Sequence, residues 1–274
     1  MMTEEQAKSL LLKQENVYTR DPQLREPAFA YCEGYKAFLN AAKTEREAVE
    51  WAVREAEANG FVPYDPTVSC KPGDRVYRVN RGKSVMLAVI GTDAPEAGFS
   101  IVVSHIDSPR LDLKQRPLYE TAGISYFKTH YYGGIKKYQW TALPLALHGV
   151  VAKTDGEVVE VNIGDDPADP VFCVTDLLPH LGSQQMDKKG SKVVEGEDLD
   201  VLVGNRPLAA THADEADDGA GKAEGDKASK DPVKAYVLAL LSDKYGIAEE
   251  DFLSAELEVV PAGRARDLGF DRSM

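Results

Sequence analysis

The residue types best suited to chemistry lie together in Ser104-His105-Ile106-Asp107-Ser108-Pro109, at the end of the apolar run 99–104. In an extended chain, side chains two positions apart point the same way, so Asp107 can hold one ring nitrogen of His105. The other nitrogen is then free to bind a metal ion or take up a proton. A loop histidine followed by a turn-capping aspartate is the plainer interpretation, and the spacing leaves both open.

Two other histidines stand in informative surroundings. His180 follows Pro179, which restricts the backbone before a predicted helix and can direct the imidazole outward, although a histidine at a helix start is more often structural. His148 lies within the apolar run 143–151 and is predicted to be a structural histidine. The pair Gly133-Gly134 is interpreted as a glycine turn between aromatic-rich strands, or as a loop that contacts a ligand.

Several function classes lack their motifs. The chain contains no HExxH, no Cys/His cluster, no GxxxxGK[ST], no GxGxxG and no GxSxG. Its formal net charge of −13 repels nucleic-acid phosphates, so no nucleic-acid partner is expected. No apolar run approaches the ~18 residues of a membrane-spanning helix. The three separated cysteines and the polar N-terminal sequence favour a cytoplasmic protein.

The elements around these residues are predicted from periodicity and caps. Helices are expected over 28–42 and from the capping box at Thr44 to Asn59-Gly60, and a β-hairpin over 76–80 and 84–90. The run 99–104 is expected to be a strand buried on both faces, which together with the helices indicates an α/β fold.

After Pro109 the pattern changes to short strands, predicted at 110–114, 125–130, 143–153, 158–163 and 171–174. This β-rich stretch is interpreted as an inserted domain over 109–253. Within it, 209–231 has no large apolar residue and is predicted to be a mobile surface loop. A helix is expected over 232–244 and a strand over 254–260.

Four motifs occur in the order found in one family: Ser104-His105-Ile106-Asp107-Ser108-Pro109, Tyr132-Gly133-Gly134, Leu178-Pro179-His180-Leu181 and the closing Gly269-Phe270-Asp271-Arg272-Ser273-Met274. On these residues the chain resembles the aspartyl aminopeptidase / aminopeptidase I family of zinc metallopeptidases. The resemblance implies an α/β fold with a zinc-exopeptidase-like sheet covered by helices and an inserted β-rich dimerisation domain. The implied organisation is 1–108 in the catalytic domain, 109–253 as the dimerisation domain, and 254–274 as the return to the catalytic domain.

The resemblance also implies roles for individual residues. His105 corresponds to a metal ligand, Asp107 to the carboxylate that orients it, and His180 to a substrate-binding histidine that reaches a neighbouring subunit's active site. The implied cofactor is zinc, two ions in the complete site. The implied partners are a peptide substrate and further copies of the chain, as dimers that assemble into dodecamer-like shells.

The resemblance further implies that the remaining metal ligands and the general base lie beyond Met274. We therefore expect the N-terminal part of a metalloaminopeptidase, which releases N-terminal amino acids in the complete enzyme and is inactive alone. The alternative is a non-catalytic assembly or regulatory module of the same family. A small-molecule binding protein built on the same sheet ranks last.

Overall fold

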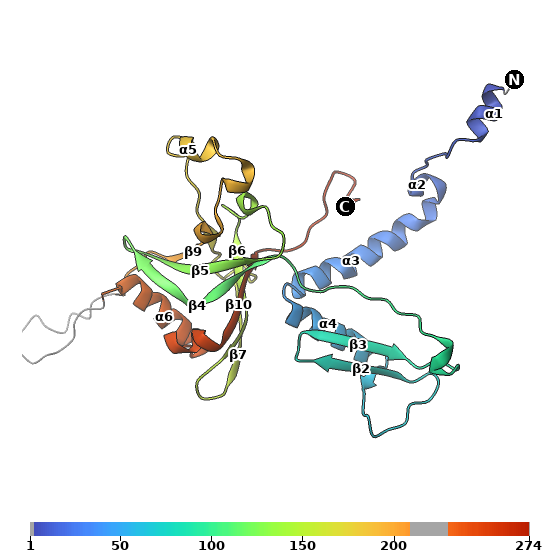
Figure 1. Ribbon diagram of the computed structural model, residues 1–274, viewed down its shortest axis with the longest axis horizontal. Helices are drawn as coiled ribbons and strands as arrows, with labels where there is room; N and C mark the ends of the chain where they lie inside the picture. The colour runs from blue at the N-terminus through green and yellow to red at the C-terminus, as the bar shows by residue number, and fades with distance from the viewer. Residues whose placement is uncertain (1–2, 209–229, 274) are drawn as a thin grey trace, which may run out of the picture. The chain divides into compact units, whose positions relative to one another are not determined.

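The computed structural model describes residues 3–208 and 230–273 and divides the chain into two compact units (Figure 1). One unit comprises residues 1–41 and 265–274, and the other comprises residues 42–264. All of the candidate site residues belong to the second unit. Most of the loop predicted over 209–231 lies outside the described residues, namely 209–229.

The described residues of the first unit form three α-helices, α1 (Glu4–Ser9), α2 (Val17–Arg20) and α3 (Arg25–Ala41). The helix predicted over 28–42 is thus present, beginning three residues earlier. Lys36 on α3 binds the carboxylate of Asp267 at 2.8 Å, and Asp267 also accepts from Arg272 at 2.6 Å. The bond from Lys36 joins the segment after 264 to α3, and the bond from Arg272 lies within that segment. No helix among the described residues combines the length and apolarity needed to span a bilayer.

The second unit begins with α4 (Glu45–Ala58), which packs on a small sheet of β1 (Val62–Pro63), β2 (Arg75–Asn80) and β3 (Ser84–Val89). The predicted capping box is present: Thr44 accepts from the backbone of Glu47, and the Glu47 carboxylate accepts from the backbone of Thr44. The predicted hairpin is also present as β2 and β3. Both elements depend on local sequence, which is why the sequence predicts them well.

This unit also contains a seven-stranded sheet, in the order β7-β6-β10-β4-β5-β9-β8. Its strands are β4 (Arg110–Thr121), β5 (Ile124–Tyr132), β6 (Leu145–Ala152), β7 (Val158–Ile163), β8 (Cys173–Val174), β9 (Val201–Gly204) and β10 (Ala255–Pro261). The β10 strand pairs with β6 and β4, so the sheet extends past the predicted domain end at 253. The division into domains itself stays a prediction.

Among the described residues, two α-helices lie between the later strands along the chain: the short α5 (Ser183–Met186) precedes β9, and α6 (Pro232–Tyr245) precedes β10. The α6 helix packs on β4, β5 and β9 through Val233, Val237 and Leu241, which are spaced four residues apart. The core beneath it includes the fully buried Leu111 and Phe127. Burial of such side chains contributes roughly 1.5–3 kcal/mol each, so this apolar layer holds the sheet together.

The strand predicted over 99–104 is wrong. This segment has no regular structure, and its apolar side chains are exposed, with Val102 fully so. An apolar run gains stability as a strand only when neighbouring strands and helices cover both of its faces. None of the strands in the described parts of the chain pairs with it. His105 therefore follows an exposed irregular segment and not the end of a buried strand.

Candidate metal-ligand site

The candidate site lies where the irregular segment 98–109 enters β4. His105 is largely exposed, with 86% of its side chain accessible. Its Nδ1 lies 3.1 Å from the backbone oxygen of Asp107 and 3.5 Å from Oδ1 of the same residue. A carbonyl oxygen can only accept, so Nδ1 carries the proton in this arrangement. The Nε2 atom of the neutral ring is then the one with a free lone pair.

Asp107 is held from a second side by Tyr132, at the end of β5. The Tyr132 hydroxyl donates to Oδ2 of Asp107 at 2.8 Å. This hydrogen bond is the main cause that lowers the pKa of Asp107, and it raises the pKa of Tyr132. At neutral pH the carboxylate is therefore ionised and the phenol is protonated.

The pair of His105 and Asp107 has the form of an oriented ligand. Metal-bound histidines generally donate their second ring N–H to a carboxylate or carbonyl oxygen, which fixes the tautomer and the ring. The contacts of Nδ1 match that form and leave Nε2 available. One imidazole supplies one ligand, and a catalytic zinc site has three protein ligands. Among residues 3–208 and 230–273, no group of three candidate ligands includes His105.

The group of three candidate ligands that the described residues do contain is Glu45, Glu256 and Glu258. Its charges are already compensated: Lys83 pairs with Glu45 and Glu256, and Arg46 also binds Glu256. Glu45 further accepts from Arg110 at 3.1 Å. These carboxylates form an ion-pair network and do not fit a metal centre.

His180 lies in a separate part of this unit, in the turn Leu178–Leu181 that leads into α5. It is exposed, as are its neighbours Leu177, Leu178 and Leu181. No contact joins it to His105 or Asp107 among the hydrogen bonds and ion pairs of the described residues. Its role in binding substrate stays a prediction, as do the roles of His105 and Asp107.

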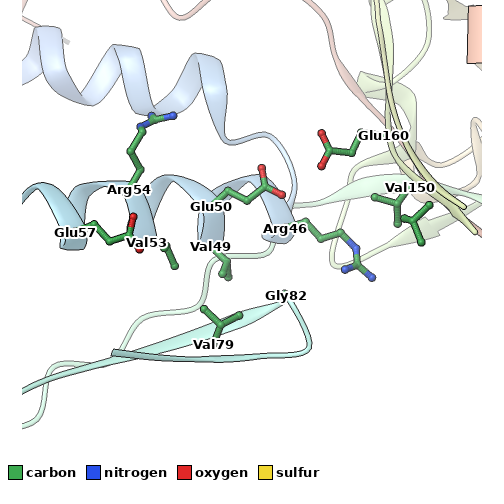
Figure 2. A pocket seen from close by; sticks show the side chains of 11 residues that line it. Arg46, Val49, Glu50, Val53, Arg54, Glu57, Val79, Gly82, Val150 and Glu160 are labelled. Atoms are coloured by element: carbon green, nitrogen blue, oxygen red, sulfur yellow. The ribbon is translucent and has the colours of Figure 1, made fainter. Parts of the chain in front are cut away.

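A groove of about 530 Å³ opens elsewhere in this unit, between α4, the β2–β3 hairpin and the strands β6 and β7 (Figure 2). Its apolar side chains are Val49, Val53, Val79, Val150 and Val158. The carboxylates of Glu50 and Glu160 face one another at the opening, and burial together with this repulsion raises the pKa of Glu50. None of the predicted site residues lines this groove.

Sequence reasoning missed Tyr132 and Arg110 as neighbours of Asp107. Arg110 is buried at the start of β4, and its guanidinium carbon lies 4.1 Å from the centre of the Tyr132 ring. Residues 110 and 132 are partners in the β4–β5 register. The aromatic residue before Gly133-Gly134 was the available signal, but only the register places it beside Asp107.

Comparison with known proteins adds to this geometry. The profile of the family "Aminopeptidase I zinc metalloprotease (M18)" matches residues 38–274. A probable M18 family aminopeptidase 1 of Clostridium acetobutylicum is 48% identical over 97% of this chain and 55% of its own length. The crystal structure of an M18 aminopeptidase from Thermotoga maritima has a TM-score of 0.83 at 42% identity, over 96% of this chain and 54% of that one.

A more distant solved structure is titled as the dodecamer of mApe1 from a yeast, S. cerevisiae, and shares the fold with a TM-score of 0.59 at 14% identity. It covers 88% of this chain and 50% of its own. The chain thus spans about half the length of the relatives it matches. The match of the family profile over most of the residues, together with the two closer likenesses, shows that this mixed α/β chain belongs to the aminopeptidase I zinc metalloprotease (M18) family.

Proposed function

We propose that this chain supplies His105 as a zinc ligand of an aminopeptidase that removes N-terminal amino acids from peptides. The observation that carries the proposal is the fixed ring of His105, whose Nδ1 contacts Asp107 while Nε2 stays free. Membership in a family of zinc metalloproteases identifies the ion. We further propose two ions per site, as the family resemblance implies.

The residues of this chain have defined parts in that function. Bound zinc supplies a Lewis acid that polarises the peptide carbonyl and activates water. Asp107 would hold His105 in the Nδ1–H tautomer, which leaves the lone pair of Nε2 available to bind zinc. His180 is proposed to bind the substrate in a neighbouring subunit, which its exposed position permits.

The test compares zinc retention in this chain with that in a protein of the relatives' full length that contains it. Because His105 offers a single ligand, we expect the chain alone to lose zinc on dialysis against a mild chelator and to show no hydrolysis of aminoacyl substrates. In the longer protein, we expect retained zinc and hydrolysis, both abolished by His105→Ala. The exposed His130, which makes no hydrogen bond or ion pair to a carboxylate in the described structure, provides the matched control His130→Ala.

Two further variants separate the roles. Asp107→Asn should lower activity by about 10–100-fold, the usual effect of losing a group that orients a metal ligand. His180→Ala should raise KM more than it lowers kcat, because it acts on substrate binding. Chelator-sensitive activity of the short chain that survives His105→Ala would overturn the site assignment.

The alternative, a non-catalytic assembly or regulatory module, is favoured by the single ligand that the described residues place at His105. It predicts that the longer protein also binds no zinc and hydrolyses nothing. The same two measurements therefore decide between the proposals.

We also propose the cytoplasm as the compartment of this protein. Cys32, Cys70 and Cys173 are free thiols in the structure, which is in keeping with a reducing environment. A fractionation of the source cells would test this.

A further inference from the structure

The carboxylate of Asp107 is engaged at both of its oxygens. Oδ1 faces Nδ1 of His105 at 3.5 Å, and Oδ2 accepts from the Tyr132 hydroxyl at 2.8 Å. Asp107 belongs to an irregular segment, whereas Tyr132 belongs to a strand of the seven-stranded sheet. The hydroxyl is therefore the point at which the rigid sheet holds the exposed ligand segment.

Tyr132 is itself fixed from its ring face. The guanidinium of Arg110 lies 4.1 Å from the ring centre, a cation–π distance. Arg110 cannot easily move, because it is buried and paired with three carboxylates from three elements: Glu45 of α4, Asp112 of β4 and Glu258 of β10. The Tyr132 ring thus packs against the guanidinium of Arg110, which is buried and held by ion pairs.

The backbone brings the same two segments together. Residues 110 and 132 are opposite one another in the β4–β5 register. Directly after Tyr132, Gly133 has a φ of +79°, and a β-carbon there would stand 3.7 Å from the α-carbon of Pro109. The turn at Gly133 therefore runs closely against the end of the His105 segment.

From these contacts we propose that Tyr132, supported by Arg110, is a positioning residue that orients His105 through Asp107. The identity of the ion that His105 serves rests on the proposed function, but the chain of contacts from Arg110 to His105 does not. Without the hydroxyl, the Asp107 carboxylate would lose its one side-chain donor from the sheet. Of the two contacts of the His105 ring in the described structure, the one to Oδ1 of Asp107 would then weaken, while the one to the backbone oxygen of Asp107 would remain, so the ring would be held less firmly.

The first experiment reads the His105 ring without metal. Nitrogen-detected NMR of the imidazoles at pH 8, where an ordinary imidazole is neutral, should show His105 mainly as the Nδ1–H tautomer. Tyr132→Phe keeps the ring over Arg110 and removes only the hydroxyl, and it should lower the share of the Nδ1–H tautomer, because the backbone oxygen of Asp107 is then the main acceptor left for Nδ1. Asp107→Asn should do the same, and the double variant should match Asp107→Asn alone, because Tyr132 acts through Asp107.

The matched control is Tyr119→Phe. Tyr119 lies in the same sheet and donates to Asp200 at 2.6 Å, so its loss removes the same kind of bond at a distance from the site. It should leave the His105 signals unchanged. An unchanged His105 spectrum in Tyr132→Phe, or an equal change in Tyr119→Phe, would overturn the proposal.

The second experiment uses a protein that contains this chain and has the full length of the relatives, with Zn²⁺ alone as the probe. Tyr132→Phe should weaken zinc affinity about 10-fold, the lower end of the effect expected for groups that orient a metal ligand, while Tyr119→Phe retains it. An affinity equal to that of the wild type would contradict the positioning role. A longer protein that holds no zinc in any variant would overturn the proposed function instead, and the metal-free NMR result would still decide on Tyr132.

Discussion

At the scale of single residues, the buried charges around Arg110 determine how this unit responds to pH. Glu258 on β10 is 3% exposed, and its Oε2 lies 3.2 Å from Nε of Arg110 without forming a hydrogen bond. Burial and the nearby charge of Glu45 raise the pKa of Glu258 to about 7. The folded protein therefore holds a proton on Glu258 that the unfolded chain has already released above its ordinary pKa of 4.5.

We predict that the stability of Glu258→Gln relative to the wild type is higher at pH 8 than at pH 5. Because the folded pKa is raised, wild-type stability falls as the pH rises from about 4.5 to about 7. The neutral amide avoids this loss, so the variant should gain about 1–3 kcal/mol on the wild type between pH 5 and pH 8, at about 1.4 kcal/mol per pKa unit. Urea unfolding at both pH values measures it.

Glu197 provides a control of opposite sign for this prediction. It is exposed, and the bond from Lys114 at 2.6 Å lowers its pKa. Glu197→Gln should therefore cost a little stability at high pH, where the ion pair is formed. A stability difference between Glu258→Gln and the wild type that stays constant from pH 5 to pH 8 would contradict the argument.

At the scale of elements, α4 joins the small sheet to the large one. His148 on β6, predicted to be a structural histidine, is buried, with Nδ1 2.7 Å from Glu47 of α4 and Nε2 3.1 Å from Asp165. Burial acts to raise the pKa of Glu47, but the hydrogen bond and charge of His148 outweigh it and lower the pKa. Glu47 thus caps its own helix and binds the sheet with the same carboxylate.

We predict that Thr44→Ala destabilises the protein by about 1 kcal/mol, because it removes the side-chain acceptor at the start of α4. Thr44→Ser keeps the hydroxyl oxygen that accepts from Glu47 and should lose less. Thermal unfolding followed by circular dichroism compares the two variants. Equal losses in both would assign the effect to the buried methyl group and not to the cap.

A second prediction at this scale concerns Gly149, in the middle of β6. Its φ is +133°, and a β-carbon there would stand 2.0 Å from the backbone oxygen of Glu256 on β10. The backbone of β10 cannot move aside as a flexible side chain can. Gly149→Ala should therefore lower the free energy of unfolding by more than ~3 kcal/mol or prevent folding. Gly190→Ala, where a β-carbon meets nothing within 4 Å, should stay within about 0.5 kcal/mol of the wild type.

The same elements show what the sequence can predict. The capping box at Thr44 and the β2–β3 hairpin follow from residues close in sequence, and both are confirmed. The strand over 99–104 is wrong, because burial on both faces depends on partners that local sequence does not reveal. The contact of Tyr132 with Asp107 was missed for a related reason, since strand register is a long-range property.

At the scale of the whole molecule, the exposed turn at His180 suggests where copies of the chain meet. Leu177, Leu178 and Leu181 are each more than half exposed around it. An apolar cluster of this kind is typical of an interaction surface. A two-fold dimer is the commonest way for copies of one chain to cover such a patch.

We predict that light scattering at high micromolar concentration shows a dimer or larger species, and that Leu181→Asp reduces it to a monomer. A charge placed in an apolar interface must be desolvated without a partner, which disfavours association. Leu240→Asp, on the exposed side of α6, should leave the mass unchanged. A folded wild-type chain that is strictly monomeric would count against an assembly role.

The uncovered apolar run ahead of His105 has a practical consequence for handling the protein. Phe99, Ile101, Val102 and Val103 are all more than 70% exposed, and no charged residue separates them. Short β-prone segments of this kind pair edge to edge with identical segments of other chains. Such growth is open-ended, unlike a closed dimer, so we expect the time for which the purified chain stays in solution to depend on its concentration more than on its unfolding temperature.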